Sequence, residues 1–406
     1  IMAGFDQNRF RTEMLGNIRI EYELLEGLKA GLHIGTRISN TKYDSYQSRA
    51  TGLGESAGGS ASVRNDDNTY GIAEYTLAYE KELGDHSIKL LGGLTYEKFE
   101  NRFVNANASQ FLSDVNGVHY YGAANPERFR TQTGKNVRTF RSYLGRLNYA
   151  YKDKYLVTAN YRLDGASVFS ETNKNSVFPS VSLGWQIASE PFMEKQDLFD
   201  VLKLRVGYGE IGNSAINNFE TLSTFSIGGN MVLGDAFLTG AVPSRIPNTD
   251  LVWETTTEVN VGLDFTLLDY RLSGGMEYYV RNTGDQLFQR PVPRSQGFGS
   301  FRQNFGNVRN SGFELTLSSQ NIVKDDFTWE TDITFATLKN EVTEVPDFVG
   351  GQVTGGGGFA FGGDFWVVKE GEAMASFYGY QVDGVYSTQA EVDAAAAQFP
   401  DGTARE

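Results

Sequence analysis

The sequence predicts an all-β protein, a membrane-spanning antiparallel up-and-down β-barrel. Three observations carry this prediction. Apolar and polar residues alternate along many segments, the connections between these segments are short and long in turn, and each segment is near the 9–11 residues of a tilted spanning strand. No run of apolar residues approaches the roughly 18 that a transmembrane helix needs.

Composition agrees with β structure. The 406 residues include 46 Gly, 28 Phe and 21 Tyr but only nine Pro. Tyr, Phe and Thr favour pleated strands, while Gly and Asn serve turns and long loops. The chain begins without Met, and neither a signal peptide nor a terminal strand pattern is visible. We therefore expect it to be a piece of a longer protein.

Charge and residue usage exclude several function classes. The net charge of -14 argues against a nucleic-acid partner, because phosphate binding needs a basic surface. The chain has no Cys, which excludes disulfides and thiolate metal sites. Its three His residues lie far apart, without the spacing of a metal motif. We expect no metal and no cofactor.

The alternation can be followed in chain order. In KYLVTANYRLD (154–164), Tyr155, Val157 and Ala159 take one phase, while Thr158 and Asn160 take the other. The stretches TEVNVGLDFTLL (257–268), YRLSGGMEYYVR (270–281) and DFTWETDITFAT (326–337) repeat the pattern. The twelve expected strands are 17–24, 28–38, 71–80, 87–98, 140–151, 154–166, 178–188, 201–209, 255–267, 271–282, 308–320 and 326–338. A thirteenth strand is expected near Phe377 to Tyr386.

Connection lengths distinguish a barrel from a soluble sandwich, whose sheets also have one apolar face. The short connections are 25–27, 81–86, 152–153, 189–200, 268–270 and 321–325. The long connections are 39–70, 99–139, 167–177, 210–254, 283–307 and everything after 338. Short turns at one end and long loops at the other are typical of outer-membrane barrels, whereas sandwiches mix connection lengths. Trp185 and Trp329, in the apolar phase, fit an interfacial aromatic belt, with ordinary packing as the alternative.

Three stretches identify a family. KYLVTANYRLDGASVF (154–169), SVFPSVSLGWQIASEPFM (176–193) and LKLRVGYGEIGN (202–213) come in this order and at these spacings, and together they resemble the SusC/RagA family of TonB-linked outer-membrane transporters of Bacteroidota. The residues that carry the resemblance are Asp164, Gly165, Phe178, Pro179, Trp185, Lys203, Arg205, Gly209, Gly212 and Asn213. The family often has Ser-Ser-Arg where this chain has Ala166, Ser167 and Val168, and Gln-Thr in place of Glu210 and Ile211.

The resemblance implies a function and its partners. It implies a 22-stranded barrel with a plug domain in its lumen, of which residues 1–406 would be a part of the barrel, with the N-terminal plug and the last strands lying outside this chain. It implies outer-membrane localisation among lipids, and import of oligosaccharides or peptides received from a SusD-like surface lipoprotein. Energy would come from TonB with ExbB and ExbD. No bond chemistry is implied, so we expect no enzyme activity.

VGYGEIGN (206–213) fits the G-x-G-x-x-G fingerprint of dinucleotide-binding loops. No helix pattern follows it, so the fingerprint lacks the helix N-terminus that would hold a pyrophosphate. We expect Gly207 and Gly209 to lie on the lumen side of a strand, where a missing side chain lets a neighbour approach, and Gly212 to begin a long loop.

The substrate is not defined by the sequence. Tyr120, Tyr121 and Phe298 lie in long loops and could stack on sugar rings, with simple anchoring of the loops as the alternative. Two other functions remain open: a passive porin with the same strands and no plug, and a soluble all-β protein that binds or cleaves glycans.

Overall fold

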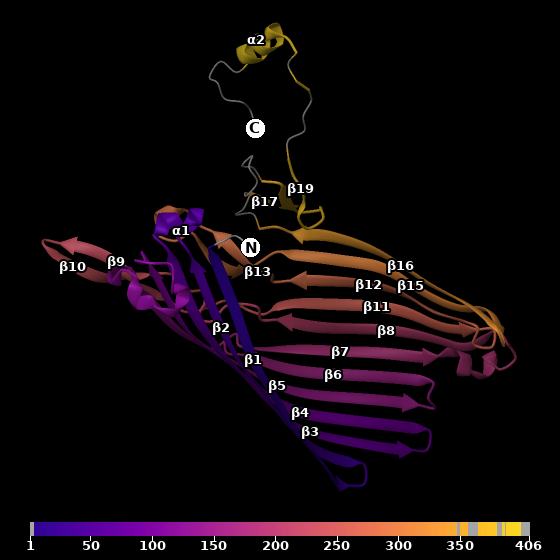
Figure 1. Cartoon of the computed structure of the whole chain (residues 1–406). Helices are drawn as coiled ribbons and strands as arrows, with labels where there is room; N and C mark the ends of the chain where they lie inside the picture. Colours follow the sequence, from indigo (N-terminus) through magenta and orange to yellow (C-terminus); the bar gives the residue numbers. More distant parts are fainter. Residues whose placement is uncertain (1–3, 347–349, 356–363, 380–383, 386, 399–406) are drawn as a thin grey trace.

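Twelve strands form one antiparallel sheet in this computed structural model, and their spatial order repeats their order along the chain (Figure 1). The structure describes residues 4–346, 350–355, 364–379, 384–385 and 387–398. The strands are β1 Phe5–Leu25, β2 Leu28–Gln47, β3 Ser60–Leu83, β4 His86–Ser109, β5 Arg130–Tyr151, β6 Tyr155–Ala166, β7 Asn175–Gln186, β8 Phe199–Asn213, β11 Glu254–Leu267, β12 Leu272–Gly284, β15 Asn307–Lys324 and β16 Phe327–Glu344. The predicted up-and-down topology is confirmed.

Shorter elements decorate the connections. Two hairpins pair β9 Phe225–Leu233 with β10 Ala236–Pro243, and β13 Leu287–Pro291 with β14 Ser300–Asn304. A small sheet holds β17 Gln352–Gly355, β18 Trp366–Lys369 and β19 Ser376–Phe377. The α-helices are α1 Gly52–Ala57 and α2 Gln389–Gln398; the 3-10 turns are η1 Gly117–His119, η2 Tyr121–Ala123, η3 Pro126–Arg128, η4 Ile187–Ser189, η5 Pro191–Met193 and η6 Arg294–Gln296. None of the helices in the described ranges is long and apolar enough to cross a membrane.

The thirteenth strand expected near Phe377 to Tyr386 is not part of the large sheet. In the described part of that segment only Phe377 is in a strand, the two-residue β19, which pairs with β18 instead. Residues 380–383 and 386 lie outside the described residues.

The connections alternate between the two ends of the sheet. The short-turn end carries 26–27, 84–85, 152–154, 187–198, 268–271 and 325–326, and the long-loop end carries 48–59, 110–129, 167–174, 214–253 and 285–306. One expectation was wrong: 187–198, at the short-turn end, is longer than 167–174 at the other end. It is longer because it contains the 3-10 turns η4 and η5; Trp185 Nε1 of β7 donates a 3.0 Å hydrogen bond to Oε1 of Glu190, which lies between them.

Tight turns close the short-turn end. Gly27, between β1 and β2, has φ +78°, a conformation that residues with a Cβ rarely adopt. A Cβ at this position would lie 2.3 Å from the carbonyl oxygen of Glu80 on β3. Glycine is therefore required both by the turn and by the neighbouring strand.

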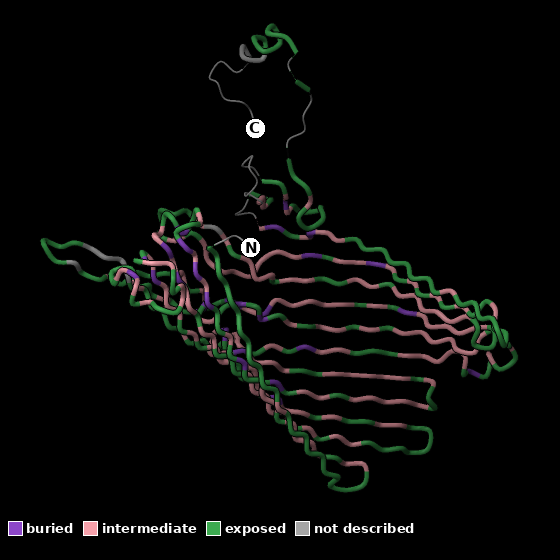
Figure 2. Tube along the Cα trace, in the orientation of Figure 1, coloured by how far each residue is buried: buried purple, intermediate pink, exposed green. Residues whose placement is uncertain are grey.

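Register gives the sheet one apolar and one polar face. Leu263 of β11 lies opposite Leu204 and Met276, whereas Asp264 lies opposite Lys203 and Gly275. The same phase continues through all twelve strands. Large apolar side chains of the apolar face stay exposed, as in the case of Tyr278 at 53%. Exposed residues recur along the long strands of the sheet (Figure 2). So much exposed apolar surface is unfavourable in water and is what a lipid-facing wall presents.

The apolar residues of the apolar face form a band, which ends before the strands reach the long-loop end. On β4 the apolar face runs through Leu90, Leu94 and Tyr96, and then changes to Lys98 and Glu100. The band thus begins near His86 and ends near Tyr96, which agrees with the roughly 9–11 residues that a spanning strand needs. Strands β1 to β5 continue far beyond it toward the long-loop end. There the apolar phase gives way to charged and polar residues, because both faces meet water.

Buried cores are small and lie at the long-loop end. The largest of the three clusters found within the described residues consists of Ala166, Val168, Phe169, Phe178, Ile216, Leu251 and Trp253. Tyr46, Ala61, Ala108, Phe111 and Ala124 form a second, under the 110–129 loop. The loops at this end are therefore packed structures.

Candidate functional site

The polar face carries the features with functional potential, since the described cavities are lined mainly by its side chains. At its centre is an ion-pair network across β8, β11 and β12. Arg205 donates to both carboxylate oxygens of Asp264 at 2.7 and 3.0 Å, and to Glu277 at 3.1 Å. Asn260 donates to the second oxygen of Glu277 at 3.2 Å. Arg205 therefore ties three strands together on the side that would face the lumen.

The two glycines expected on the lumen side are found there. Gly207 lies opposite Asn260, whose Oδ1 occupies the space that a Cβ would need, at 2.3 Å. Gly209 lies opposite Ser180 and Glu258. Glycine at 207 thus lets a neighbouring side chain approach, and no nucleotide-binding turn exists here because β8 continues to Asn213.

Gly212 does not begin a loop as expected, since it is still in β8. A Cβ on Gly212 would lie 2.0 Å from Cζ of Phe178, which is buried in the largest core cluster. Asn213 closes the strand: its Oδ1 accepts from the Ala215 N–H at 3.0 Å, and its Nδ2 donates to Glu254 at 3.1 Å. Two of the family residues, Gly212 and Phe178, are therefore spatial partners.

This contact predicts the effect of a single methyl group. Gly212→Ala should destabilise the folded protein by about 1–3 kcal/mol, because Phe178 must leave its place in a packed core. Gly145→Ala is the matched control, since nothing lies within 4 Å of a Cβ in that strand position. Thermal unfolding in detergent measures both variants, and equal midpoints would contradict the proposed packing role of Gly212.

The remaining family residues have structural surroundings. Asp164 accepts two hydrogen bonds from Arg162 Nε, at 2.7 and 2.8 Å, and Gly165 leaves room for Asn175 Oδ1 at 2.6 Å. Pro179 lies opposite Tyr161 on the apolar face. Lys203 lies beside Arg205 in the polar phase, opposite Asp264.

The departure from the family at position 168 has a packing reason. Val168 is 3% exposed and lies in the largest core cluster with Trp253, whose indole N–H donates to the Lys174 carbonyl at 3.2 Å. An apolar side chain fills this position under the 214–253 loop, where a charged one would need a partner.

Aromatic side chains collect at the short-turn end of the apolar face. Trp185 is bonded to Glu190, Tyr151 stacks on Tyr155 with ring centroids 6.3 Å apart, and His86 lies 4.8 Å from Tyr151. Trp329 is 54% exposed on the same face. This arrangement fits the expected interfacial belt.

A cationic surface, which we name the arginine wall, lies on the polar face of the outer halves of β1, β2 and β5. It consists of Arg9, Arg11, Arg37 and Arg138, which line a cavity of about 470 Å³. Asn68, Asn101 and Asn136 occupy one register row across β3, β4 and β5 in the same cavity, and Tyr70 and Phe99 occupy the next row.

The sequence did not reveal the arginine wall. Apart from Arg37, its members and the asparagine row fell outside the expected strands, because alternation disappears where β1 to β5 extend past the apolar band. A signal was nevertheless present: Asn68, Asn101 and Asn136 stand at nearly equal distances from their hairpin turns. Antiparallel pairing across each hairpin brings such positions into one row.

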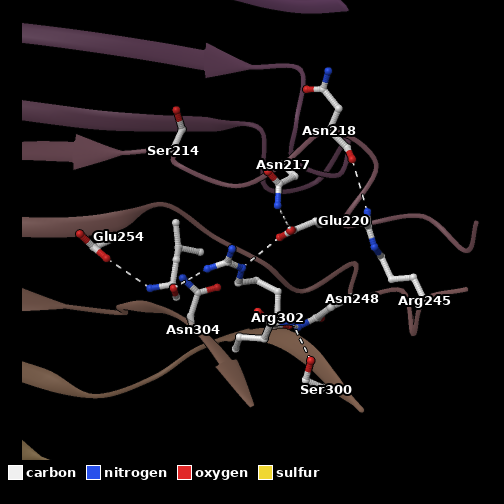
Figure 3. A network of polar contacts seen from close by, with 12 residues as sticks. Ser214, Asn217, Asn218, Glu220, Arg245, Asn248, Glu254, Ser300, Arg302 and Asn304 are labelled. Atoms are coloured by element: carbon white, nitrogen blue, oxygen red, sulfur yellow. Dashed lines mark hydrogen bonds and ion pairs between the residues drawn. The ribbon is translucent and has the colours of Figure 1, made fainter. Parts of the chain in front are cut away.

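The long loops are joined by a network of part-buried polar contacts around the buried Glu220, which we name the outer clamp (Figure 3). Glu220 accepts from Asn217 Nδ2 at 2.7 Å and from Arg302 Nε at 3.1 Å, and its side chain is only 9% exposed. Asn304 exchanges two 2.9 Å hydrogen bonds with the backbone of Val252. The clamp therefore fastens the 214–253 loop to the β13–β14 hairpin.

The 214–253 loop also reaches the arginine wall. Asn218 Nδ2 donates to the Val137 carbonyl at 3.2 Å, and Arg138 donates to the Oγ of Ser214 at 2.8 Å and to its carbonyl. The outer clamp thus holds a loop directly above the cationic cavity, which Asn218 helps to line.

The three loop aromatics expected to meet sugars are not gathered into one place. Tyr121 is an anchor: it packs against Phe111 and Phe129, and its hydroxyl donates to the Ala106 carbonyl at 3.2 Å. Tyr120, in the same loop, is 57% exposed, and Phe298 lies half-buried in the β13–β14 hairpin.

Tyr46 and Asp114 fix the second core cluster at the rim. The Tyr46 hydroxyl donates to Asp114 at 2.8 Å, and Arg49 Nε donates to the same carboxylate at 3.2 Å. Burial, together with Asp114, raises the pKa of Tyr46 to about 12, and the hydrogen bond from Tyr46 lowers the pKa of Asp114. No group of three or more His, Asp or Glu side chains suited to a metal occurs in the described ranges.

Comparison with known proteins decides the family. Residues 3–401 match the family described as TonB dependent receptor-like, beta-barrel. This chain belongs to that family. The TonB-dependent receptors are an outer-membrane family of transport proteins and not of enzymes, in agreement with the expectation from sequence. Membership also makes the soluble all-β alternative wrong, because the family fold is a membrane barrel.

Similar proteins support the assignment as a TonB-dependent receptor. TonB-dependent receptor P3 of Formosa agariphila is 34% identical, over 96% of this chain and 38% of its own. TonB-dependent receptor SusC of Bacteroides thetaiotaomicron is 36% identical, over 75% of this chain and 31% of its own. A structure titled as the RagAB peptide transporter has the same fold, with a TM-score of 0.81 at 23% identity, over 92% of this chain and 40% of that one. The chain thus spans less than half the length of these relatives.

Proposed function

We propose that this chain is the barrel wall of an active outer-membrane importer of oligosaccharides or peptides. The observation that carries the proposal is the match of residues 3–401 to the TonB-dependent receptor barrel. The named relatives support it, since one is SusC and one structural neighbour is titled a peptide transporter. In this proposal the apolar face meets lipid, the short-turn end faces the periplasm, and the long loops face the outside.

The open edges of the sheet support a larger barrel. Within the described residues, β1 and β16 each pair on one side only. Unpaired backbone N–H and C=O groups are unfavourable in hydrocarbon, so strands that span a membrane must close into a barrel. We therefore propose that residues 1–406 form part of a barrel of about 22 strands, a size whose lumen holds a plug.

The proposed partners follow from the family. TonB with ExbB and ExbD would energise import by acting on the plug, and a SusD-like lipoprotein would deliver substrate at the long-loop end. The outer clamp suits this role, because its part-buried hydrogen bonds give the rim a defined shape to which a partner can dock. A passive porin is the second candidate, and an energy requirement separates the two.

Uptake in the host tests the proposal. The complete receptor should fractionate with the outer membrane and co-purify with a surface lipoprotein. Deletion of its gene should abolish uptake of its substrate, and a protonophore or loss of TonB should abolish uptake in the undeleted strain. Uptake that continues unchanged without TonB would favour the passive porin, and a receptor found only in soluble fractions would refute both candidates.

A further inference from the structure

The arginine wall lies above the part of the sheet that would cross the membrane. On β5 the apolar face changes to a charged residue, Arg141, after Tyr143. Arg138 and Asn136 lie farther toward the long loops. On β4, Asn101 likewise lies beyond Lys98. The wall is therefore at the outer mouth of the polar face, where a molecule that enters from the long-loop end arrives first.

The charge of this surface is opposite to that of the chain. The whole chain carries -14, yet four arginines line the cavity. Glu13 serves two of them, at 2.7 Å from Arg11 and 3.6 Å from Arg37. Glu100 also borders the cavity, but it is held by Lys98, Arg102 and Lys135. The cavity therefore keeps an excess of positive charge.

Two of the arginines have no carboxylate partner within the described part of the chain. Arg9 lies over the Tyr43 ring at 5.9 Å from its centroid, and Arg138 lies over the Phe140 ring at 4.8 Å. Arg138 bonds only to neutral oxygens of Ser214, and burial lowers its pKa. A half-buried guanidinium without a counter-charge favours an anion nearby.

Register arranges these cations around groups that suit a sugar. Arg37, Tyr70, Phe99 and Arg138 follow one another across β2, β3, β4 and β5, so two arginines flank an aromatic pair. The two rings lie 4.6 Å apart, and Phe99 is 41% exposed although it belongs to the polar face. The next row toward the long loops holds Asn68, Asn101 and Asn136.

Each group has a matching feature in an acidic sugar. Guanidinium groups pair with carboxylates or sulfates through two parallel hydrogen bonds. Exposed aromatic rings offer a flat apolar surface, and amides bind hydroxyls. Arg37 and Arg138 are three strand spacings apart, or about 14 Å, which is more than one sugar can bridge. Below the wall, Glu97 is bonded by the Tyr70 hydroxyl at 3.0 Å, so negative charge returns deeper in the lumen.

We propose that the arginine wall is the outer binding site for an anionic oligosaccharide. The inference rests on the proposed function and specifies its substrate class. The carboxylate or sulfate groups would pair with Arg9, Arg37 and Arg138, and the sugar rings would lie on Phe99 and Tyr70. An acidic peptide lacks the flat apolar ring faces that the aromatic row is placed to meet.

Binding to the complete receptor in detergent tests the site. The probes are an oligogalacturonate, a sulfated oligosaccharide, a neutral malto-oligosaccharide and an oligoglutamate of matched length, measured by calorimetry at low and high salt. We expect at least one acidic oligosaccharide to bind, with affinity that falls as salt rises, and the neutral sugar to bind at least tenfold more weakly. Equal binding of the neutral sugar, or preference for oligoglutamate, would overturn the ligand class.

Variants locate the binding. Arg37→Gln with Arg138→Gln should lower affinity for the acidic oligosaccharide by about a hundredfold, since each of the two lost charge-assisted bonds is worth roughly tenfold. Arg37→Lys should retain part of the affinity. Arg146→Gln is the control: Arg146 lies deeper on the same face, bonded to Asn160 at 2.6 Å, and its loss should leave affinity unchanged.

Unchanged affinity in the double variant would refute the site. If the double variant instead lowered the unfolding temperature by the same amount with and without the probe, the arginines would serve the receptor's own assembly, and the proposal would fall. Failure here is separate from failure of the proposed function: a receptor that imports a neutral sugar through TonB would keep the function and lose the anion site.

Discussion

Replacing Glu220 with alanine is expected to release the outer loops from the barrel. The packed state of these loops should be destabilised by about 3–5 kcal/mol. Glu220 is the buried acid of the outer clamp, and Arg302, only 24% exposed, is its ion-pair partner (Figure 3). Removal of the carboxylate leaves a guanidinium inside the loop packing with the Leu287 carbonyl as its remaining partner. Because only about a quarter of this side chain is exposed, water can replace the lost carboxylate fully only if the loops open.

Hydrogen exchange across the 214–253 loop measures this release. The amide of Val252, which donates to Asn304, should lose protection together with the amide of Asn248, which donates to the Glu220 carbonyl. Glu258→Ala is the matched control, because its pair with Arg281 is half exposed and should contribute no more than about 1 kcal/mol. The double replacement of Glu220 by Leu and Arg302 by Met should recover most of the protection. Equal exchange in the Glu220 and Glu258 variants would show that the clamp does not hold the loops.

The sequence predicted the membrane-spanning part of the fold because lipid imposes a period of two on it. Leu263 and Met276, which lie in the apolar phase of the stretches 257–268 and 270–281, meet Leu204 across three strands. Short turns such as 26–27 and 84–85 could be placed because charge and glycine gather there. Where one face of a strand meets lipid and the other meets water, the alternation of apolar and polar residues shows which residues lie on each face.

The outer halves of β1 to β5 could not be predicted in this way. From Lys98 outward on β4, water lies on both sides, so Glu100 and Arg102 on one face are as polar as Asn101 on the other. Alternation carries no information there, so the sequence predicts loops in place of these outer halves. Apart from Arg37, the members of the arginine wall lie on these outer halves, and for that reason the sequence does not reveal the wall.

The outer clamp shows a different limit. Glu220 and Arg302 lie 82 positions apart, on a loop and on a hairpin strand, and no local pattern connects them. Their pairing depends on the fold having placed β8 beside β11 and β12 beside β15. The family residues give the opposite case: Gly212 and Phe178 were singled out by resemblance, and the structure supplies their contact as the reason.

Orientation in the bilayer gives the second large expected effect. Leu183 on β7 is 51% exposed on the apolar face, opposite Val157 and Val206, and Leu183→Arg should cost about 2–4 kcal/mol in a lipid bilayer. Its neighbour Ser182 lies on the polar face between Thr158 and Gly207. Ser182→Arg should therefore be mild, because the guanidinium would project into a polar lumen.

A second pair repeats the contrast on β6, with Val157→Arg costly and Thr158→Arg mild. The adjacent pair Leu263 and Asp264 on β11 is not used, because replacement of Asp264 would also break its ion pair with Arg205. A soluble sheet would show the same asymmetry in water, so the measurement must be made in a bilayer. There, tryptophan at 183 or 157 should be quenched by brominated acyl chains, and tryptophan at 182 or 158 should not. Equal quenching at adjacent positions would mean that the apolar face does not meet lipid, because a strand in a barrel wall cannot turn both of its faces outward.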